Sequence, residues 1–187
     1  MERTRIAVEV AFPYLVSKGR GNVPRFVSQL DFHTFDFEHE FLIENFYRPN
    51  VALPMQALRL EHGEGYDCAG FLFGSKDKVA YLSDVSFVPP ETMARLNALE
   101  EPLSLLVIDS LRPYSPEKIT RPQVHFDLED ALRCVKEFRV PPKRTIIVGM
   151  GHEFDYEPSN AILAQLDPSQ FGHVECGYDG MTFDFEL

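Results

Sequence analysis

Two histidines and one aspartate each stand at the end of an apolar run, in three separate parts of this sequence: His62, Asp84 and His152. Short apolar runs are typical of buried strands, and α/β proteins place their sites where the ends of neighbouring strands meet at one edge of a sheet. Imidazole nitrogens and carboxylate oxygens are ligands of zinc, manganese and iron. The sequence therefore predicts that these three side chains come together and hold metal.

Each of the three residues also has an ordinary structural explanation when it is taken alone. His62 lies where a run gives way to Gly63, and His152 follows Gly151, so either imidazole can be a hydrogen-bonded loop residue. Asp84 can cap a turn or a helix with its carboxylate. The metal hypothesis depends on the repetition of one pattern, in which an apolar run and a potential ligand follow each other three times.

The elements that must position these residues follow from hydrophobic periodicity, which predicts an α/β fold in one domain. Short apolar runs predict strands at residues 51–60, 68–73, 79–82, 103–108 and 145–148. Helical spacing predicts helices at residues 4–15, 89–99, 128–138 and 159–166. Pro13 is expected to end or kink the first helix, and Asp127 and Ser159 are expected to cap the last two.

Two further segments show the alternation of apolar and polar residues that is typical of strands. Residues 25–41 alternate loosely and predict two adjacent antiparallel strands. Residues 173–185 predict a terminal hairpin that turns at Tyr178-Asp179-Gly180.

Length and charge exclude several classes of protein. With 187 residues and 44% hydrophobic residues, the chain can bury a real core and is not expected to be disordered. The net charge of −11 disfavours binding to a nucleic-acid backbone. The longest apolar runs have the length of strands, so no membrane span is expected.

Cysteine usage points to a reducing compartment. The three cysteines, Cys68, Cys134 and Cys176, have no Cys-x-x-Cys spacing, which favours free thiols over a disulfide framework or a cysteine-zinc site. The start of the sequence shows no secretory signal pattern. We therefore expect a cytoplasmic protein.

Several segments, in order, resemble the C-terminal half of the metallo-beta-lactamase fold, over about residues 12–187. The branch that the sequence resembles contains cyclic-phosphate phosphodiesterases and plant and fungal hydrolases. The matching segments are FPY at 12–14, EHG at 61–63, GFLFG at 70–74, YLSDVS at 81–86, VIDSLR at 107–112, GMGHEFD at 149–155 and YDG at 178–180. The resemblance implies a partial αββα sandwich, in which a mixed sheet carries helices on one face.

The resemblance also implies roles for the three ligand candidates in a two-metal site. His62 corresponds to a ligand of one metal, Asp84 to the carboxylate that bridges both, and His152 to a ligand of the second. Zinc is implied, with manganese or iron as alternatives. The His-x-His-x-Asp-His motif of the family's N-terminal half has no counterpart in this sequence. We therefore expect an incomplete domain over residues 1–187, which does not bind metal tightly by itself.

Asp109 and His125 are the candidates for a catalytic role. Asp109 lies just beyond the predicted strand 103–108 and resembles an aspartate that orients ligand histidines in related enzymes, although an ion pair with Arg112 or another neighbour is an equal alternative. His125 lies near the place where phosphodiesterase relatives carry a histidine that protonates the leaving oxygen. A hydrogen bond at the start of the following helix is the alternative for His125.

The function that the resemblance implies is metal-dependent hydrolysis of a small-molecule phosphodiester, once the missing half of the site is supplied. One alternative is a truncated binding or structural module without catalysis. A second alternative is an iron oxygenase centre formed by His62, Asp84 and His152. Because half of a sandwich leaves one apolar sheet face uncovered, we also expect a homo-oligomer or a complementary chain over that face.

Overall fold

The computed structural model describes residues 2–16, 30–45, 48–113 and 123–186, which fall into two compact units. The first unit, Met1–His39, contains the helices α1 (Glu2–Ala11) and α2 (Pro13–Val16). The predicted helix with a break at Pro13 is confirmed, because a proline nitrogen has no hydrogen to donate to the preceding turn. The second unit, Glu40–Leu187, carries the candidate site.

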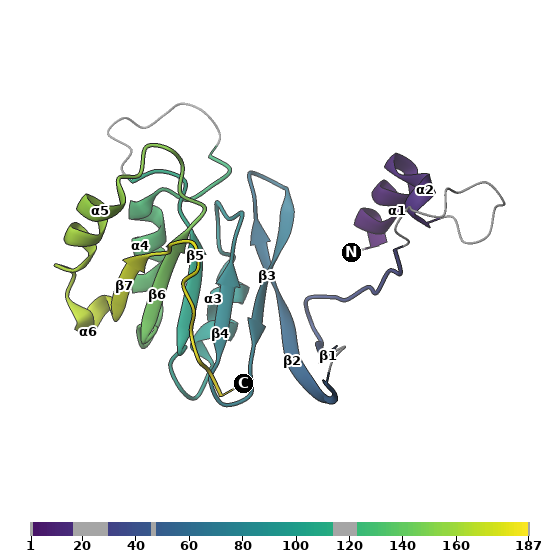
Figure 1. Ribbon diagram of the computed structural model, residues 1–187, viewed down its shortest axis with the longest axis horizontal. Coiled ribbons are helices and arrows are strands. Elements are labelled where there is room, and N and C mark those ends of the chain that lie inside the picture. Colours follow the sequence, from purple (N-terminus) through teal and green to yellow (C-terminus); the bar gives the residue numbers. More distant parts are fainter. Residues whose placement is uncertain (1, 17–29, 46–47, 114–122, 187) are drawn as a thin grey trace. The chain divides into compact units, whose positions relative to one another are not determined.

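The second unit is built on one seven-stranded mixed sheet, in which the spatial order of the strands follows the sequence (Figure 1). The strands are β1 (Glu40–Asn45), β2 (Arg48–Glu61), β3 (Asp67–Phe73), β4 (Val79–Leu82), β5 (Leu105–Asp109), β6 (Arg144–Val148) and β7 (His173–Cys176). Strands β1 to β4 pair antiparallel, and β4 to β7 pair parallel. The predicted strands at the ends of which the ligand candidates lie are thus confirmed.

Helices cover one face of this sheet. They are α3 (Pro90–Asn97), α4 (Leu128–Lys136), α5 (Tyr156–Leu163) and α6 (Pro168–Phe171), and they lie in the connections between the parallel strands, where a crossover is required. The main core joins Leu82 and Ile108 of the sheet to Met93 of α3 and Val135 of α4. Among the described residues, no helix has the length and hydropathy needed to cross a membrane.

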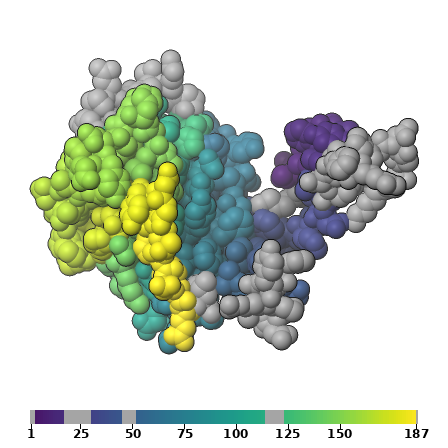
Figure 2. Space-filling model, in the orientation of Figure 1, coloured from purple at the N-terminus to yellow at the C-terminus, as the bar shows by residue number. Residues whose placement is uncertain are grey.

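The opposite face of the sheet is covered in part by the C-terminal segment, residues 181–186. Met181, Phe183 and Phe185 alternate with exposed residues and pack against a second core cluster that contains Leu105 and Ile146. In Figure 1 this segment, in yellow, runs in front of the sheet, and Figure 2 shows it lying over the strands. The predicted hairpin is wrong, although its turn exists: the segment places its apolar side chains on the sheet face and forms no strand.

Two other predictions fail for local reasons. Residues 30–39 form no strand, because the Asp36 carboxylate accepts hydrogen bonds from the backbone N–H groups of Glu38 and His39 and so competes with a strand ladder. Predicted residues 25–29 lie outside the described part of the chain. Ser159 does not cap α5; the N-cap is Asp155, because Pro158 is tolerated in the first turn of a helix.

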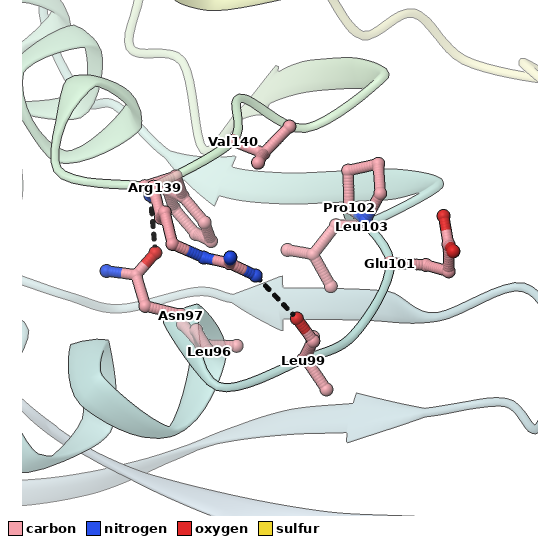
Figure 3. A pocket seen from close by; sticks show the side chains of 9 residues that line it. Leu96, Asn97, Leu99, Glu101, Pro102, Leu103, Arg139 and Val140 are labelled. Atoms are coloured by element: carbon pink, nitrogen blue, oxygen red, sulfur yellow. Dashed lines mark hydrogen bonds between the residues drawn. The ribbon is translucent and has the colours of Figure 1, made fainter.

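The end of the sheet remote from the site is closed by polar contacts (Figure 3). Asn97 Oδ1 accepts a hydrogen bond from the backbone N–H of Arg139 at 2.6 Å, and the Arg139 guanidinium donates to the Leu99 carbonyl at 3.1 Å. The cavity between these residues has a volume of about 10 Å³, which is the space of a single water molecule. This cavity therefore has no room for a substrate.

Candidate metal site

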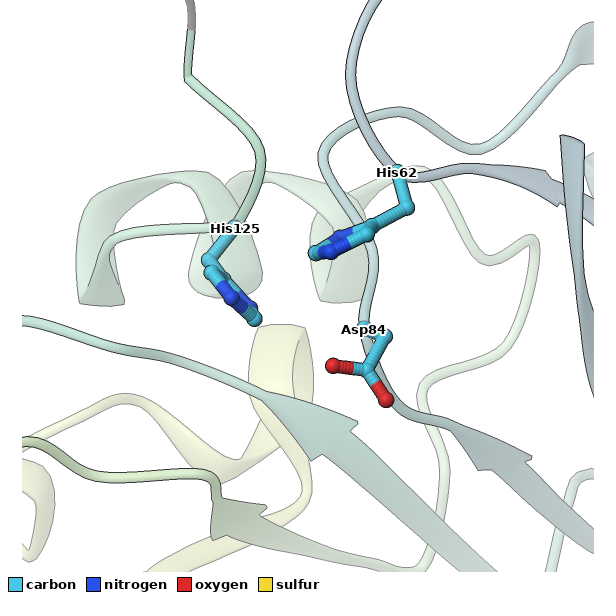
Figure 4. Close-up of side chains that lie close together, drawn as sticks. All are labelled: His62, Asp84 and His125. Atoms are coloured by element: carbon cyan, nitrogen blue, oxygen red, sulfur yellow. The ribbon is translucent and has the colours of Figure 1, made fainter. Parts of the chain in front are cut away.

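His62, Asp84 and His125 lie together beyond the ends of β2 and β4 and before α4 (Figure 4). Each of them offers one donor atom, and the three atoms all lie within 4.8 Å of one another. The donors come from segments that are far apart in the sequence, and the sheet brings them to one edge. The structure therefore joins two of the predicted ligands, His62 and Asp84, to the candidate proton donor His125.

The His62 ring is held in a tight turn. The His62 backbone N–H donates to the Tyr66 carbonyl at 2.9 Å, and the next N–H, that of Gly63, donates to Ser86 Oγ at 2.7 Å. The Nδ1 atom of His62 is buried and has no hydrogen-bond partner among the described residues. Because an unpaired buried polar atom costs free energy, this nitrogen calls for a partner.

Asp84 lies just after β4 with an unusual backbone. Its φ of 53° makes it the only residue other than glycine with a positive φ in the described part of the chain. The Cys68 thiol donates to the Asp84 carbonyl at 3.1 Å and so helps to hold this conformation. Burial raises the pKa of Cys68 to about 11, which keeps the proton of this hydrogen bond on sulfur at neutral pH. Such strained residues cluster at functional sites.

A buried carboxylate fixes the third member of the group. Asp109 is 2% exposed, and its Oδ2 lies 2.7 Å from Nδ1 of His125, so Nε2 of the imidazole is left for another partner. Burial raises the pKa of Asp109, and the hydrogen bond with His125 acts in the opposite direction. Gly149 makes room for this carboxylate, because a Cβ atom there would lie 2.1 Å from Asp109 Oδ1. A histidine oriented in this way by a carboxylate is the usual arrangement at metal sites.

His152 does not belong to this group. It lies exposed on the loop after β6, and its role as the ligand of a second metal stays a prediction. Arg112 pairs with Asp127 at 3.9 Å and with Glu153 at 3.7 Å, and Asp109 pairs with His125 instead. Of the ion pairs considered for Asp109, the one with Arg112 is therefore not formed, and the neighbour with which Asp109 pairs is His125. The sequence indicated His125 as a candidate proton donor, but no pattern in it predicts that His125 lies beside His62 and Asp84. The spacing of residues does not determine the path of a loop.

The donor set fits a single divalent cation. Donors about 2 Å from a common zinc ion lie at most about 4 Å apart, so side-chain adjustments of less than about 1 Å bring the three atoms into coordination. Two imidazoles and one carboxylate are a frequent donor set of catalytic zinc sites, which keep a fourth position for water. The three residues thus supply three ligands to one metal. The roles implied by the resemblance give each of two metals only two ligands, Asp84 and one histidine.

We expect Asp109→Asn to weaken zinc binding about 10- to 100-fold, because the amide no longer fixes His125 as a carboxylate does. Isothermal titration of zinc into the purified variant measures this change. Asp179→Asn is the matched control, since Asp179 is an exposed acid outside the group. Equal zinc affinities of wild type and Asp109→Asn would contradict a positioning role.

The raised pKa of Asp109 should also make the free energy of unfolding depend on pH. Because burial raises its pKa above the ordinary 3.8, the folded chain binds this proton more tightly than the unfolded chain does. The contribution of Asp109 to the free energy of unfolding therefore decreases as the pH rises from 3.8 through the raised pKa. Urea unfolding at a series of pH values should show that this decrease is lost in Asp109→Asn, and identical pH profiles would contradict it.

Comparison with known proteins identifies the family of this architecture. The sequence model of the beta-lactamase superfamily domain matches residues 3–150. A diphosphatase of the PhnP family has a similar structure, with a TM-score of 0.67, 24% sequence identity and coverage of 100% of this chain and 57% of that one. No curated protein sequence is significantly similar.

Two further solved structures show the same fold at lower sequence identity. The metallo-beta-lactamase fold protein YhfI from Bacillus subtilis has a TM-score of 0.59 and 16% identity and covers 92% of this chain and 59% of its own. Zinc-bound PqqB from Methylobacterium extorquens has a TM-score of 0.57 and 14% identity, with coverage of 85% and 56%. The chain thus spans less than two thirds of the length of these similar proteins.

Proposed function

Because the chain belongs to the beta-lactamase superfamily and has the metallo-beta-lactamase fold, we propose that it is a metal-dependent hydrolase that acts on a phosphodiester. The observation that carries the proposal is the convergence of His62, Asp84 and His125 within 4.8 Å, with His125 held by the buried Asp109. Fold alone would not support an activity, since one fold hosts many functions.

Three side chains of this chain would bind a cation, and a fourth orients one of these ligands. His62, Asp84 and His125 would hold the cation, and Asp109 keeps the His125 ring in place through Nδ1. When bound, a divalent cation lowers the pKa of a coordinated water and polarises the scissile bond. In the tautomer in which the Asp109 carboxylate accepts the Nδ1–H of His125, the lone pair of Nε2 would be available to a cation.

Charge supports an anionic substrate only if a cation is present. The chain has a net charge of −11, so a phosphodiester approaches it against the average field. A bound divalent cation reverses the field locally and gives the phosphate a place to bind. The similar diphosphatase of the PhnP family favours phosphorus chemistry over other hydrolytic reactions.

His125 can serve in a second way, as the group that protonates the leaving oxygen. One nitrogen cannot hold a metal and donate a proton at the same time, and Nδ1 is engaged by Asp109. We assign His125 as the third ligand because its donor atom lies with those of His62 and Asp84. In the alternative assignment, substitution of His125 leaves zinc bound and removes turnover.

A two-metal site would need ligands beyond those that this sequence supplies. The family's His-x-His-x-Asp-His motif does not occur in this sequence, and the chain spans 57% of the similar diphosphatase. We propose that a second metal, held by Asp84 and His152, binds only when another chain adds ligands. Alone, this chain is expected to hold one cation.

Hydrolysis of bis(4-nitrophenyl) phosphate by the zinc-loaded chain tests the proposal. We expect release of 4-nitrophenolate that requires zinc and is abolished in Asp84→Asn, with the Asp179→Asn control unchanged. Zinc binding without turnover, also after manganese or iron is supplied, would refute the hydrolase and support the alternative of a binding module. Iron-dependent oxygen consumption would point to the oxygenase.

A further inference from the structure

An exposed tyrosine stands directly beside the candidate metal group. Tyr66 is 66% exposed, and the centre of its ring lies 6.3 Å from that of His62, with an angle of 69° between the two ring planes. The His62 ring lies in turn 4.7 Å from the ring of His125 (Figure 4). Two of these three rings belong to proposed ligands, and the third does not. Tyr66 therefore forms the outer end of a row of rings that includes the metal group.

The turn between β2 and β3 fixes the backbone of Tyr66. The His62 N–H donates to the Tyr66 carbonyl at 2.9 Å, and the Tyr66 N–H donates to the Gly63 carbonyl at 3.1 Å. The turn requires a positive φ at Gly63 and at Gly65, of +89° and +71°, which glycine adopts without strain. Because these bonds hold Tyr66 in place before any ligand arrives, the ordering cost of a contact with its ring is small.

A second apolar side chain borders the same turn. Val124, the residue before His125, is 43% exposed, and its Cγ1 atom lies 3.0 Å from the position that a Cβ atom on Gly63 would take. Val124 thus packs against the turn that carries His62. Because His62 and His125 lie on the two segments that meet here, Tyr66 and Val124 give the metal group a border of exposed apolar surface.

Charge selects the kind of group that this border can receive. Glu64, in the same turn, is exposed and would repel an anionic substituent. An exposed aromatic ring gains free energy when a second planar ring covers it, both by leaving water and by the attraction between the two rings. The surface beside the metal group therefore favours an uncharged aromatic group.

We propose that the Tyr66 ring binds an aromatic substituent of the phosphodiester substrate by stacking, while the phosphate lies at the metal group. A phosphodiester carries two substituents, so a phosphate bound next to His62 can place one of them against the ring that contacts His62. The inference rests on the proposed function and narrows the substrate to diesters with at least one planar aromatic group. Tyr66 is thus assigned to substrate binding, and the chemical step is left to the metal group.

Binding of diphenyl phosphate to the zinc-loaded chain, measured by isothermal titration, tests the inference without relying on turnover. We expect Tyr66→Leu to weaken this binding about 5- to 10-fold and Tyr66→Phe, which keeps the ring, to change it less than about twofold. Dimethyl phosphate, which has no ring, should bind equally to the wild type and to Tyr66→Leu. Tyr178→Leu is the matched control, since Tyr178 is 57% exposed and its ring contacts Tyr156.

The outcomes separate this inference from the proposed function. Absence of diphenyl phosphate binding in the presence of zinc, or equal affinities of wild type and Tyr66→Leu, would overturn it even if zinc-dependent turnover is found. An equal loss in Tyr66→Phe would assign the contact to the hydroxyl and would also overturn stacking. A loss that is confined to diphenyl phosphate and to Tyr66→Leu, with zinc stoichiometry and urea unfolding unchanged, would support it even if no diester is hydrolysed.

The same variant separates binding from chemistry in a chain that is active. We expect Tyr66→Leu to raise the KM for bis(4-nitrophenyl) phosphate about 5- to 10-fold and to leave kcat nearly unchanged, because stacking stabilises substrate and transition state alike. An unchanged KM, or a fall in kcat with an unchanged KM, would contradict a role of Tyr66 in substrate binding.

Discussion

Asp84→Asn is expected to lower the affinity of the chain for zinc by more than about 100-fold and to leave the fold intact. Loss of a residue that only orients a ligand costs about 10- to 100-fold, and loss of a ligand should cost more. Asparagine keeps the size of the side chain and is, with aspartate, among the residues that best tolerate a positive φ, here 53°. The loss should therefore come from the missing charge and oxygen ligand.

Zinc titration together with circular dichroism separates these effects. The Asp84→Asn variant should unfold at the wild-type urea concentration and show little heat of zinc binding, while Asp179→Asn should match the wild type in both measurements. Wild-type zinc affinity in a folded Asp84→Asn chain would show that this carboxylate is not a ligand.

Gly149→Ala is expected to damage the site and the fold together. A Cβ atom would lie 2.1 Å from Asp109 Oδ1, and the backbone φ of +72° is strained for alanine. The strained backbone alone costs about 1–3 kcal/mol of the free energy of unfolding. Displacement of the Asp109 carboxylate should in addition release His125 and weaken zinc binding by about 10- to 100-fold.

Gly180→Ala provides the matched comparison for this prediction. Gly180 has a similar φ of +86°, and an added Cβ atom would meet nothing within 4 Å. Both variants should be less stable in urea unfolding, but only Gly149→Ala should lose zinc affinity. Equal zinc affinity in the two variants would mean that glycine is needed at position 149 only for its positive φ and does not make room for Asp109.

Much of the site could be predicted because its residues end regular elements. His62 and Asp84 follow strands whose apolar patterns are strong, and the ends of neighbouring strands must meet at one edge of the sheet. Asp109 ends β5 for the same reason. Hydrophobic periodicity therefore predicted the positions of these three residues, and the resemblance to the metallo-beta-lactamase fold implied their roles.

The remaining features depend on tertiary contacts that no local pattern encodes. His125 reaches the group through a loop, and its pairing with Asp109 crosses 16 residues of sequence. The C-terminal segment has the alternation of a strand, and it follows a turn, but its apolar side chains bind the open sheet face instead of extending the sheet. Alternation reports that one side of a segment is buried, and it does not report against what.

The number of zinc ions bound per chain, compared between wild type, His125→Asn and His152→Asn, tests the central claim most directly. If His62, Asp84 and His125 form the site, elemental analysis after dialysis will find about one zinc per wild-type chain, one in His152→Asn and almost none in His125→Asn. Zinc that stays in His125→Asn and is lost from His152→Asn, or a wild-type chain that holds no zinc, would contradict it.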